Sequence, residues 1–541
     1  MTPTRRAVAL GAVTASALAA AGPAGAIGAG GGFSVSGKKG PFVKQVASRK
    51  LDQATQGGGS LALASDAVNS GQYQAARLRM PETEARVAAL LDGIDSRWPY
   101  PKGQPLQVHI LGVDYFNAYS LPDGSIMVAF GLLDQAQSDD EVAFVLAHEL
   151  GHVRLGHFNR AAGAQQKRQM ASQLGQLFVV GAALHSGGAV SAIAQGTAAQ
   201  AGATNDFLHF LVNVTTEPTH SRGQEDEADC IGYDLSLAAS YSADSASARV
   251  FDTIQADQVK RASMTDALDA QLKSQLGQVL TEGTAQSFLS GGLSPGGMRN
   301  SLIRGAGMFA LGVASAGMSD QGPQHRPPEE RKKGISQYSI DAYPDGAPLR
   351  EEQHAWLTQV RASKEYAQGK IAVEAIAEAK KARAAGDYPT ATKAVARAMQ
   401  TNFRDAPLVL NEAARLHDDM GDASGSDRLF LQAHASPDQT VDGYLDHVRM
   451  LYRTRQNDRA MQIIQDGTQR FDNDEKPFLS LMIAIARQSG RPDEAQRYLQ
   501  QCLSYNDDGL TKDCQLAAGP EASKATPKKS PSLPFGLPRF P

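Results

Sequence analysis

Two histidines with metal-ligand spacing give the clearest chemical signal in this chain: His148 and His152 enclose Glu149 in the sequence HELGH. Acids at the start of this segment and bases near its end suit the helix dipole and predict one helix over residues 139–160. Histidines four residues apart lie on one helical face, so both imidazoles can bind one tetrahedral zinc ion. Glu149 is rotated by about 100° from His148 and can accept a proton from an attacking water molecule.

An HExxH sequence also arises by chance in about one such chain in a hundred, so its context must decide. A catalytic zinc site needs a third protein ligand and an open fourth position for water. His157 is excluded on the predicted helix, since nine residues carry it to the face opposite His148. Glu225 and Asp229 are a better source, being four residues apart on a second predicted helix. Glu225 could bind the metal while Asp229 accepts the second ring N–H of a ligating histidine. Alone, this acidic cluster would indicate a solvated helix face.

Two strands are expected before the helix that carries His148 and His152. Residues 106–116 alternate apolar and polar side chains, and residues 125–133 form an apolar run. The segment from Asn117 to Gly124 predicts a turn that places an exposed strand beside the metal site, where an extended substrate could pair through its backbone. The alternative is an ordinary hairpin without a role in binding.

Length and charge restrict the classes of protein. The chain has 541 residues, and at about 150 residues per domain it suggests about three units. Its 53 basic and 57 acidic residues give a formal charge of −4, too balanced to supply the basic field that nucleic-acid binding uses. We therefore expect no nucleic-acid partner.

The first 26 residues predict a secretory signal peptide. Arg5 and Arg6 precede an Ala-rich apolar run over residues 7–21, and small residues form a cleavage site after it. A membrane anchor is the alternative, but a spanning helix needs about 20 apolar residues. Export would follow, and the Gly-rich residues 27–60 predict a flexible lead-in.

The C-terminal third predicts paired helices over residues 365–516. Its turn markers are separated by 35, 36 and 33 residues, close to the tetratricopeptide period of about 34. The Pro-rich residues 517–541 predict a disordered tail. The turn markers are Gly386, Gly421, Asn457 and Gly490.

The cysteines fit an oxidising compartment. Cys502 and Cys514 flank a polar stretch that can reverse the chain, and a disulfide closing a loop of this length contributes about 3 kcal/mol. The alternative is two free thiols. Cys230 is left over and is expected to be a buried structural thiol.

Two apolar stretches, residues 172–212 and 288–319, allow more than one interpretation. Neither is an uninterrupted span of about 18 apolar residues. For residues 172–212, buried helices of the same domain are favoured, and a hairpin lying against a membrane or a hydrophobic client is the alternative. Residues 288–319 are equally ambiguous and are expected to cap that domain.

Three motifs together resemble a known family. AHELGHVRLGH (147–157), SRGQEDEAD (221–229) and NAYSLPDG (117–124) are similar to gluzincin endopeptidases of the HtpX and CaaX-prenyl-protease type, in particular their exported branch with a tetratricopeptide tail. The resemblance implies an α+β fold, mainly helical with a small sheet, followed by an all-α repeat domain. It also implies a peptidase domain over residues 61–340 and a connector over residues 341–364.

The resemblance also assigns roles to side chains. Glu225, rather than Glu227, is implied as the third zinc ligand, with one Zn²⁺ per chain and Asp229 beside it. His325 resembles a downstream family histidine that either blocks the zinc or stabilises the oxyanion, although Arg326 follows it where the family usually has proline. Residues 226–324 would then include a lid.

These observations predict a zinc-dependent endopeptidase. The resemblance implies a periplasmic protein that acts on unfolded or misassembled envelope proteins, in outer-membrane quality control and with chaperone-like client binding. The helical repeats would recruit clients or outer-membrane assembly machinery, and peripheral membrane contact is a further expectation. The alternative is a binding scaffold in which the repeats act and the peptidase is latent.

Overall fold

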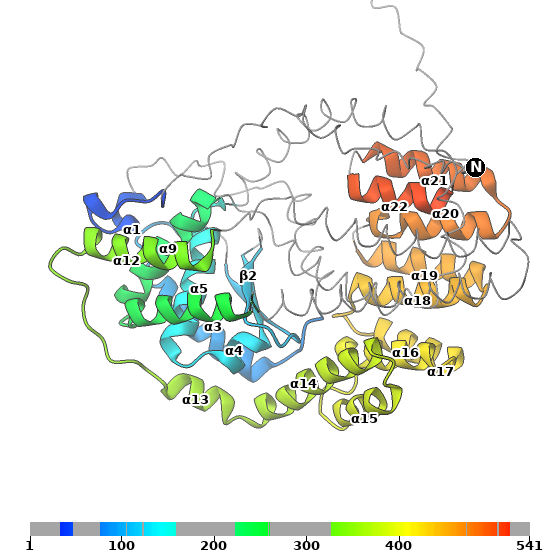
Figure 1. Ribbon diagram of the computed structural model, residues 1–541, viewed down its shortest axis with the longest axis horizontal. Helices are drawn as coiled ribbons and strands as arrows, with labels where there is room; N and C mark the ends of the chain where they lie inside the picture. Colours follow the sequence, from blue (N-terminus) through cyan, green and yellow to red (C-terminus); the bar gives the residue numbers. More distant parts are fainter. Residues whose placement is uncertain are drawn as a thin grey trace, which may run out of the picture.

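The computed structural model describes residues 33–46, 76–157, 222–259 and 326–519, except 104, 122–123, 258, 472 and 506–507. Helices dominate these residues, and a small three-stranded sheet lies among the first of them (Figure 1). The α+β class and the all-α C-terminal part are confirmed. The expected signal peptide, both ambiguous apolar stretches and the tail from residue 520 lie outside the described residues.

The N-terminal half contains the sheet and the two helices that carry the motifs. Its described elements are η1 (Gly37–Lys39), α1 (Phe42–Gln45), α3 (Pro81–Asp95), β1 (Gln107–Leu111), β2 (Ala118–Ser120), β3 (Ser125–Ala129), α4 (Phe130–Gln135), α5 (Asp139–Arg154), α9 (Arg222–Ala238) and α12 (Pro328–Ala342).

The sheet has the order β1-β3-β2, with β1 parallel and β2 antiparallel to β3. Strands β2 and β3 are antiparallel and form an ordinary hairpin, as the alternative had it. A direct turn between the two expected strands is wrong, because these are β1 and β3, which run parallel and cannot be joined by a tight turn. The segment predicted as a turn instead contains β2, which returns into β3 through Gly124, whose φ is +88°. The apolar run predicted as one strand ends at Ala129 and continues as α4, since apolar runs alone do not distinguish buried strand from buried helix.

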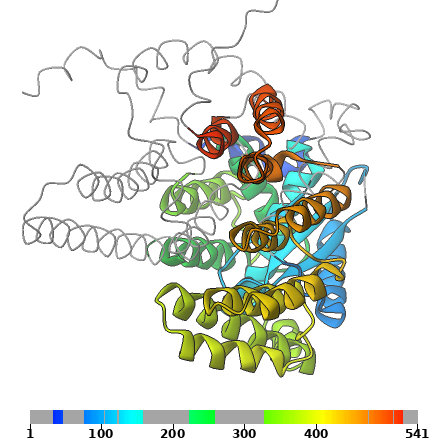
Figure 2. The same ribbon diagram turned by 90° about the vertical axis from the view of Figure 1, so that its right-hand side faces the viewer.

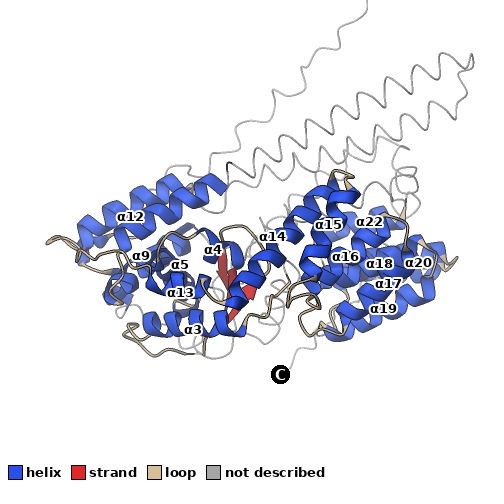
Figure 3. Ribbon diagram, turned by 90° about the horizontal axis from the view of Figure 1, so that it is seen from below, coloured by secondary structure: helices blue, strands red, loops and turns tan. Residues whose placement is uncertain are grey.

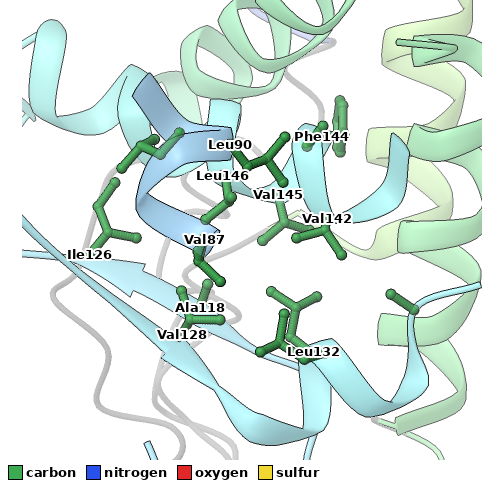
Figure 4. Packing of buried hydrophobic residues seen from close by; sticks show 14 of the residues in the cluster. Val87, Leu90, Ala118, Ile126, Val128, Leu132, Val142, Phe144, Val145 and Leu146 are labelled. Carbon is green, nitrogen blue, oxygen red and sulfur yellow. The ribbon is translucent and has the colours of Figure 1, made fainter. Parts of the chain in front are cut away.

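Helix α5 lies at the centre of the first core. All its residues except Val153 are buried, and it packs on α3, on the sheet and most extensively on α9. Figure 4 shows part of this packing, in which Val87 of α3, Val128 of β3 and Leu146 of α5 lie in one apolar cluster. The position of α5 is therefore fixed along nearly its whole length.

Parts of two expected loops belong to this core. Phe42 and Val46, within the predicted flexible lead-in, are buried in the same cluster, so that prediction is wrong for residues 33–46. Ile231 and Phe251, within the predicted lid, are buried there as well, so the described residues of that range are core rather than lid. In both segments the apolar residues are widely spaced among glycines or acids, so the sequence shows no regular alternation of apolar side chains there.

The C-terminal half is a stack of helices, visible in Figure 2 from yellow to red. Neighbouring helices pack in pairs, α14 on α15, α16 on α17, α18 on α19 and α20 on α21. The elements are α13 (Ala355–Arg361), α14 (Lys364–Ala384), α15 (Tyr388–Met399), α16 (Pro407–Asp419), α17 (Ala423–His434), α18 (Val441–Arg453), α19 (Asn457–Arg470), η4 (Lys476–Phe478), α20 (Leu479–Gln488), α21 (Pro492–Ser504) and α22 (Asp508–Ala518).

The turns inside these pairs have a common chemistry. Gly386 and Gly421 adopt φ values of +75° and +83°, which end the preceding helix in the left-handed region that glycine allows. The aspartates that follow, Asp387 and Asp422, accept hydrogen bonds from the backbone N–H of Thr390 and of residue 425 and so cap the next helix. The Gly-Asp pairs seen in the sequence thus both end one helix and begin another.

The two halves share apolar contacts. Val373 of α14 and Leu408 of α16 belong to the same buried cluster as the α5 core, and Arg79 forms an ion pair with Asp438 between α17 and α18. In Figure 3 the two groups of helices lie side by side with α14 between them. At the far end Cys502 and Cys514 form a disulfide. Among the described residues, no helix is long and apolar enough to cross a membrane.

Candidate metal centre

The first turn of α5 is anchored by its own sequence. The side chain of Ser138 accepts a hydrogen bond from the Glu141 N–H at the N-cap, and three acids follow in the first turn, where the helix dipole favours them. Two of these carboxylates reach the connector: Asp139 accepts from the backbone N–H of Leu357, and Asp140 from that of Gln353. The helix therefore begins at a fixed place relative to the rest of the core.

Three candidate ligands meet between α5 and α9. The Nε2 atoms of His148 and His152 are 3.1 Å apart, and carboxylate oxygens of Glu225 lie 3.7 Å and 3.4 Å from them. One donor atom of each side chain lies within 4.8 Å of the others. Two imidazoles and a carboxylate, all buried, suit zinc with one coordination position left for water or substrate. The donor set therefore fits the metal that the sequence predicts.

Two glycines allow the helices to approach closely enough for this geometry. A Cβ atom at Gly151 of α5 would lie 3.3 Å from the backbone of Ala228, and one at Gly232 of α9 would lie 3.2 Å from the backbone nitrogen of His148. Both distances are tighter than ordinary van der Waals contact. Larger residues would push α9 away and take Glu225 with it.

Asp229 lies behind His148, as the i, i+4 spacing from Glu225 predicts. Its Oδ1 is 2.9 Å from Nδ1 of His148. Arg331 of α12 donates two hydrogen bonds to the same carboxylate, of 2.9 Å and 2.6 Å. Burial alone would raise the pKa of Asp229, but the charge of Arg331, together with His148, holds it below its usual value. Asp229 is thus an ionised acceptor for the ring of His148.

Glu149 points towards the sheet. Ser120 of β2 donates a hydrogen bond of 2.9 Å to Oε2 of Glu149, and both side chains are buried. Strand β2 is one of the two edge strands of the three-stranded sheet and packs against α5. The edge is therefore beside the carboxylate that the sequence assigns to proton transfer.

Backbone groups of Asn117 and Gly124 hold β2 in register. The carbonyl of Asn117 accepts from the Ala129 N–H, and the N–H of Gly124 donates to the carbonyl of Leu121. The side chains of β2 are buried, with exposed fractions of 7%, 7% and 1% from Ala118 to Ser120. Only a backbone edge, not an exposed strand face, is thus available to a peptide among the described residues.

His157 lies elsewhere than the sequence predicts. Helix α5 ends at Arg154 and not at residue 160, because Gly156 adopts a φ of +62° and turns the chain. After this turn the Nδ1 atom of His157 lies 2.9 Å from Nδ1 of His152. It still supplies no ligand to the described cluster. A glycine just after the last apolar turn, which marks a helix end, was the available signal.

Other residues of this region were not singled out by the sequence. Ser120 and Arg331 hold site residues, yet single polar residues on separate elements have no spacing that would show this. Arg326 donates two hydrogen bonds to Asp226 of α9, which gives this departure from the family pattern a structural role. His325 lies outside the described residues.

Comparisons with known proteins agree with this geometry. Residues 81–289 match peptidase family M48. Metalloprotease LoiP of Escherichia coli is 35% identical over 133 residues, 25% of this chain and 45% of that protein. The beta-barrel assembly-enhancing protease of Yersinia pestis is 30% identical over 128 residues, 24% of each chain.

A more distant relative, mitochondrial metalloendopeptidase OMA1 of Schizosaccharomyces pombe, is 27% identical over 169 residues, 31% of this chain and 41% of that protein. The chain thus spans less than half the length of each of these curated relatives. The family match over residues 81–289 includes the helix with His148 and His152 and the helix with Glu225. Over residues 81–289, therefore, this chain is similar to peptidase family M48.

Proposed function

We propose that the protein is an exported zinc-dependent endopeptidase that cleaves unfolded or misassembled envelope proteins. The observation that carries the proposal is the convergence of His148, His152 and Glu225 beside Glu149 in one buried cluster. This donor set leaves a position for water or substrate, and Glu149 supplies a base next to it.

Each residue has a role that its geometry supports. His148, His152 and Glu225 would hold the zinc ion, which when bound polarises the scissile carbonyl and activates water. Glu149 accepts the proton of the attacking water and returns it to the leaving amine. The hydrogen bond from Ser120 orients the Glu149 carboxylate and ties it to the strand at which the substrate would lie.

The edge strand β2 is suited to an extended peptide. Backbone pairing to a sheet edge depends little on sequence, so the substrates would be chains that are unfolded or have exposed extended segments. A folded protein keeps its backbone groups paired and would be protected. This fits a role in removing misassembled proteins.

The remaining features support a periplasmic setting. A signal peptide and a disulfide are expected of an exported chain, and one relative is named a beta-barrel assembly-enhancing protease. The helix pairs of the C-terminal half would form a tetratricopeptide-like array that recruits clients, with chaperone-like binding, or an outer-membrane assembly machine. Peripheral membrane contact is part of the same proposal.

The test measures zinc content and cleavage together. The full chain should bind one zinc ion and cleave unfolded casein, whereas Glu149→Gln should bind zinc without cleaving. Mass spectrometry of proteins trapped by Glu149→Gln in the native envelope would then identify clients. A wild-type protein that binds clients without zinc or cleavage would instead support the scaffold alternative.

A further inference from the structure

His157 lies at the end of a row of three side chains that begins at the metal centre. Its ring is fully buried, and its Nδ1 lies 2.9 Å from Nδ1 of His152, with the two ring centroids 4.9 Å apart and the planes nearly perpendicular. The other ring nitrogen of His157, Nε2, lies 3.2 Å from Oε2 of Glu227 on α9. The row thus runs from a candidate ligand to a carboxylate.

The distances allow one consistent arrangement of protons when a metal is bound. Nε2 of His152 faces Nε2 of His148 and Glu225, so this is the nitrogen available to the metal. The proton of His152 must then be on Nδ1, where it can be donated only to a lone pair. Nδ1 of His157 supplies that lone pair if its own proton is on Nε2, and this N–H then donates a hydrogen bond to Oε2 of Glu227.

We propose that His157 is a positioning residue for the metal ligand His152. By accepting the Nδ1–H of His152, and with its own tautomer set by Glu227, it holds the imidazole in the orientation and tautomer that metal binding requires. This inference rests on the proposed function. Each ligating histidine then has its own acceptor: Asp229 acts directly on His148, and Glu227 acts on His152 through a second ring.

The backbone supports this role independently of the ring. Gln224 of α9 donates a hydrogen bond of 2.8 Å to the carbonyl of His157, and the preceding residue, Gly156, adopts a left-handed φ of +62° that turns the chain here. Gln224 and Glu227 are three residues apart on one face of α9 and hold the backbone and the ring, respectively. Replacing the ring should therefore leave the path of the chain intact.

The test compares two substitutions with opposite properties. His157→Phe keeps the buried ring volume but removes the acceptor, whereas His157→Asn is smaller but can place its amide oxygen near the position of Nδ1. Zinc affinity, measured by competition with a chromogenic chelator, should fall about 10- to 100-fold in His157→Phe. It should stay within about threefold of wild type in His157→Asn, since the acceptor is kept.

Further variants separate positioning from folding. His447→Phe in α18 is a matched control, because that histidine is also fully buried and bonded to a carboxylate, Asp427, but is not part of the metal centre. It should leave zinc affinity unchanged. Should His157→Phe not fold, Glu227→Ala takes its place, and Glu227→Gln, which keeps an acceptor oxygen, should restore the affinity that Glu227→Ala loses.

The outcomes distinguish this inference from the proposed function. If the wild-type chain bound no zinc, the proposed function itself would be wrong. If wild type bound zinc and His157→Phe bound it equally tightly, only the positioning role would be wrong. Equal weakening by His157→Phe and His157→Asn would also overturn it, because packing rather than an acceptor would then be the cause. Visible absorption of the cobalt-substituted variants gives an independent record of the ligand geometry.

Discussion

Ser120 and Glu149 are joined by a buried hydrogen bond of 2.9 Å, in which the hydroxyl donates to the carboxylate. Glu149→Gln keeps the size of the side chain but removes the base, so casein cleavage should fall at least about a hundredfold, the scale of general-base catalysis. Zinc content should not change, because Glu149 is not in the ligand cluster. Substantial cleavage by this variant would remove Glu149 from its assigned role.

The same hydrogen bond predicts a smaller effect for Ser120→Ala. The carboxylate would keep its charge but lose one contact that orients it, so kcat/KM should fall about three- to tenfold, with zinc content unchanged. The double variant Ser120→Ala/Glu149→Gln should be no worse than Glu149→Gln alone, because the hydroxyl acts through the carboxylate. Additive losses in this cycle would mean that Ser120 acts on the substrate instead.

The third ligand is tested by two neighbouring acids. Glu225→Gln should lower zinc affinity strongly, because it replaces a carboxylate that lies 3.4 Å from Nε2 of His152. Glu227→Gln should change it little, since Glu227 contacts His157 rather than the metal and the amide keeps an acceptor oxygen for that ring. Zinc competition on both purified variants gives the answer, and a reversed order of affinities would show that the register on α9 is misassigned.

The sequence could predict the metal cluster because its residues sit on two helices with fixed periodicity. His148 and His152 are one turn apart, and the same spacing separates Glu225 from Asp229, so each pair is constrained before any tertiary contact is known. The close approach of α5 and α9 depends instead on Gly151 and on the α9 glycine that packs against the backbone of His148. Such contacts between distant segments have no local signature.

The sequence predictions were wrong at the C-terminal end of one helix and in the way the strands are connected. The helix through His148 ends at Arg154, and a helix continued to residue 160 places His157 on the wrong face. The two strands were expected to be separate and joined by a turn, yet β2 lies between them in the chain and beside β3 in the sheet. Neither the helix end nor the order of strands follows from the alternation of apolar residues.

The disulfide predicts a local effect on stability. Cys502 and Cys514 are 12 residues apart, and opening a loop of this length costs about 3 kcal/mol in the chain-entropy account. Replacing both by serine should make α21 and α22 more sensitive to limited proteolysis. Zinc content should be unaffected, because the buried residues of these helices belong to a separate apolar cluster within the C-terminal helices and not to the α5 core. A loss of zinc in this variant would instead indicate coupling across the whole stack.

Asp234 predicts a dependence of stability on pH away from the metal centre. The side chain of this α9 residue is buried and accepts hydrogen bonds from the Tyr338 and Tyr343 hydroxyls and from the Val43 N–H. Burial raises the pKa of Asp234 to about 6, although these hydrogen bonds lower it in part. The folded chain thus holds this proton more tightly than the unfolded chain, in which the pKa is about 3.9.

The contribution of Asp234 to stability should therefore be greatest at low pH and be lost as the pH rises through about 6. Two pKa units correspond to roughly 3 kcal/mol. Asp234→Asn cannot titrate, so the thermal midpoint of wild type should fall relative to this variant between about pH 4 and pH 7. Asp252→Asn, which alters a half-exposed carboxylate paired with Lys332, is the control and should show no such trend. A constant difference between wild type and Asp234→Asn across this range would mean that Asp234 keeps the same protonation state throughout.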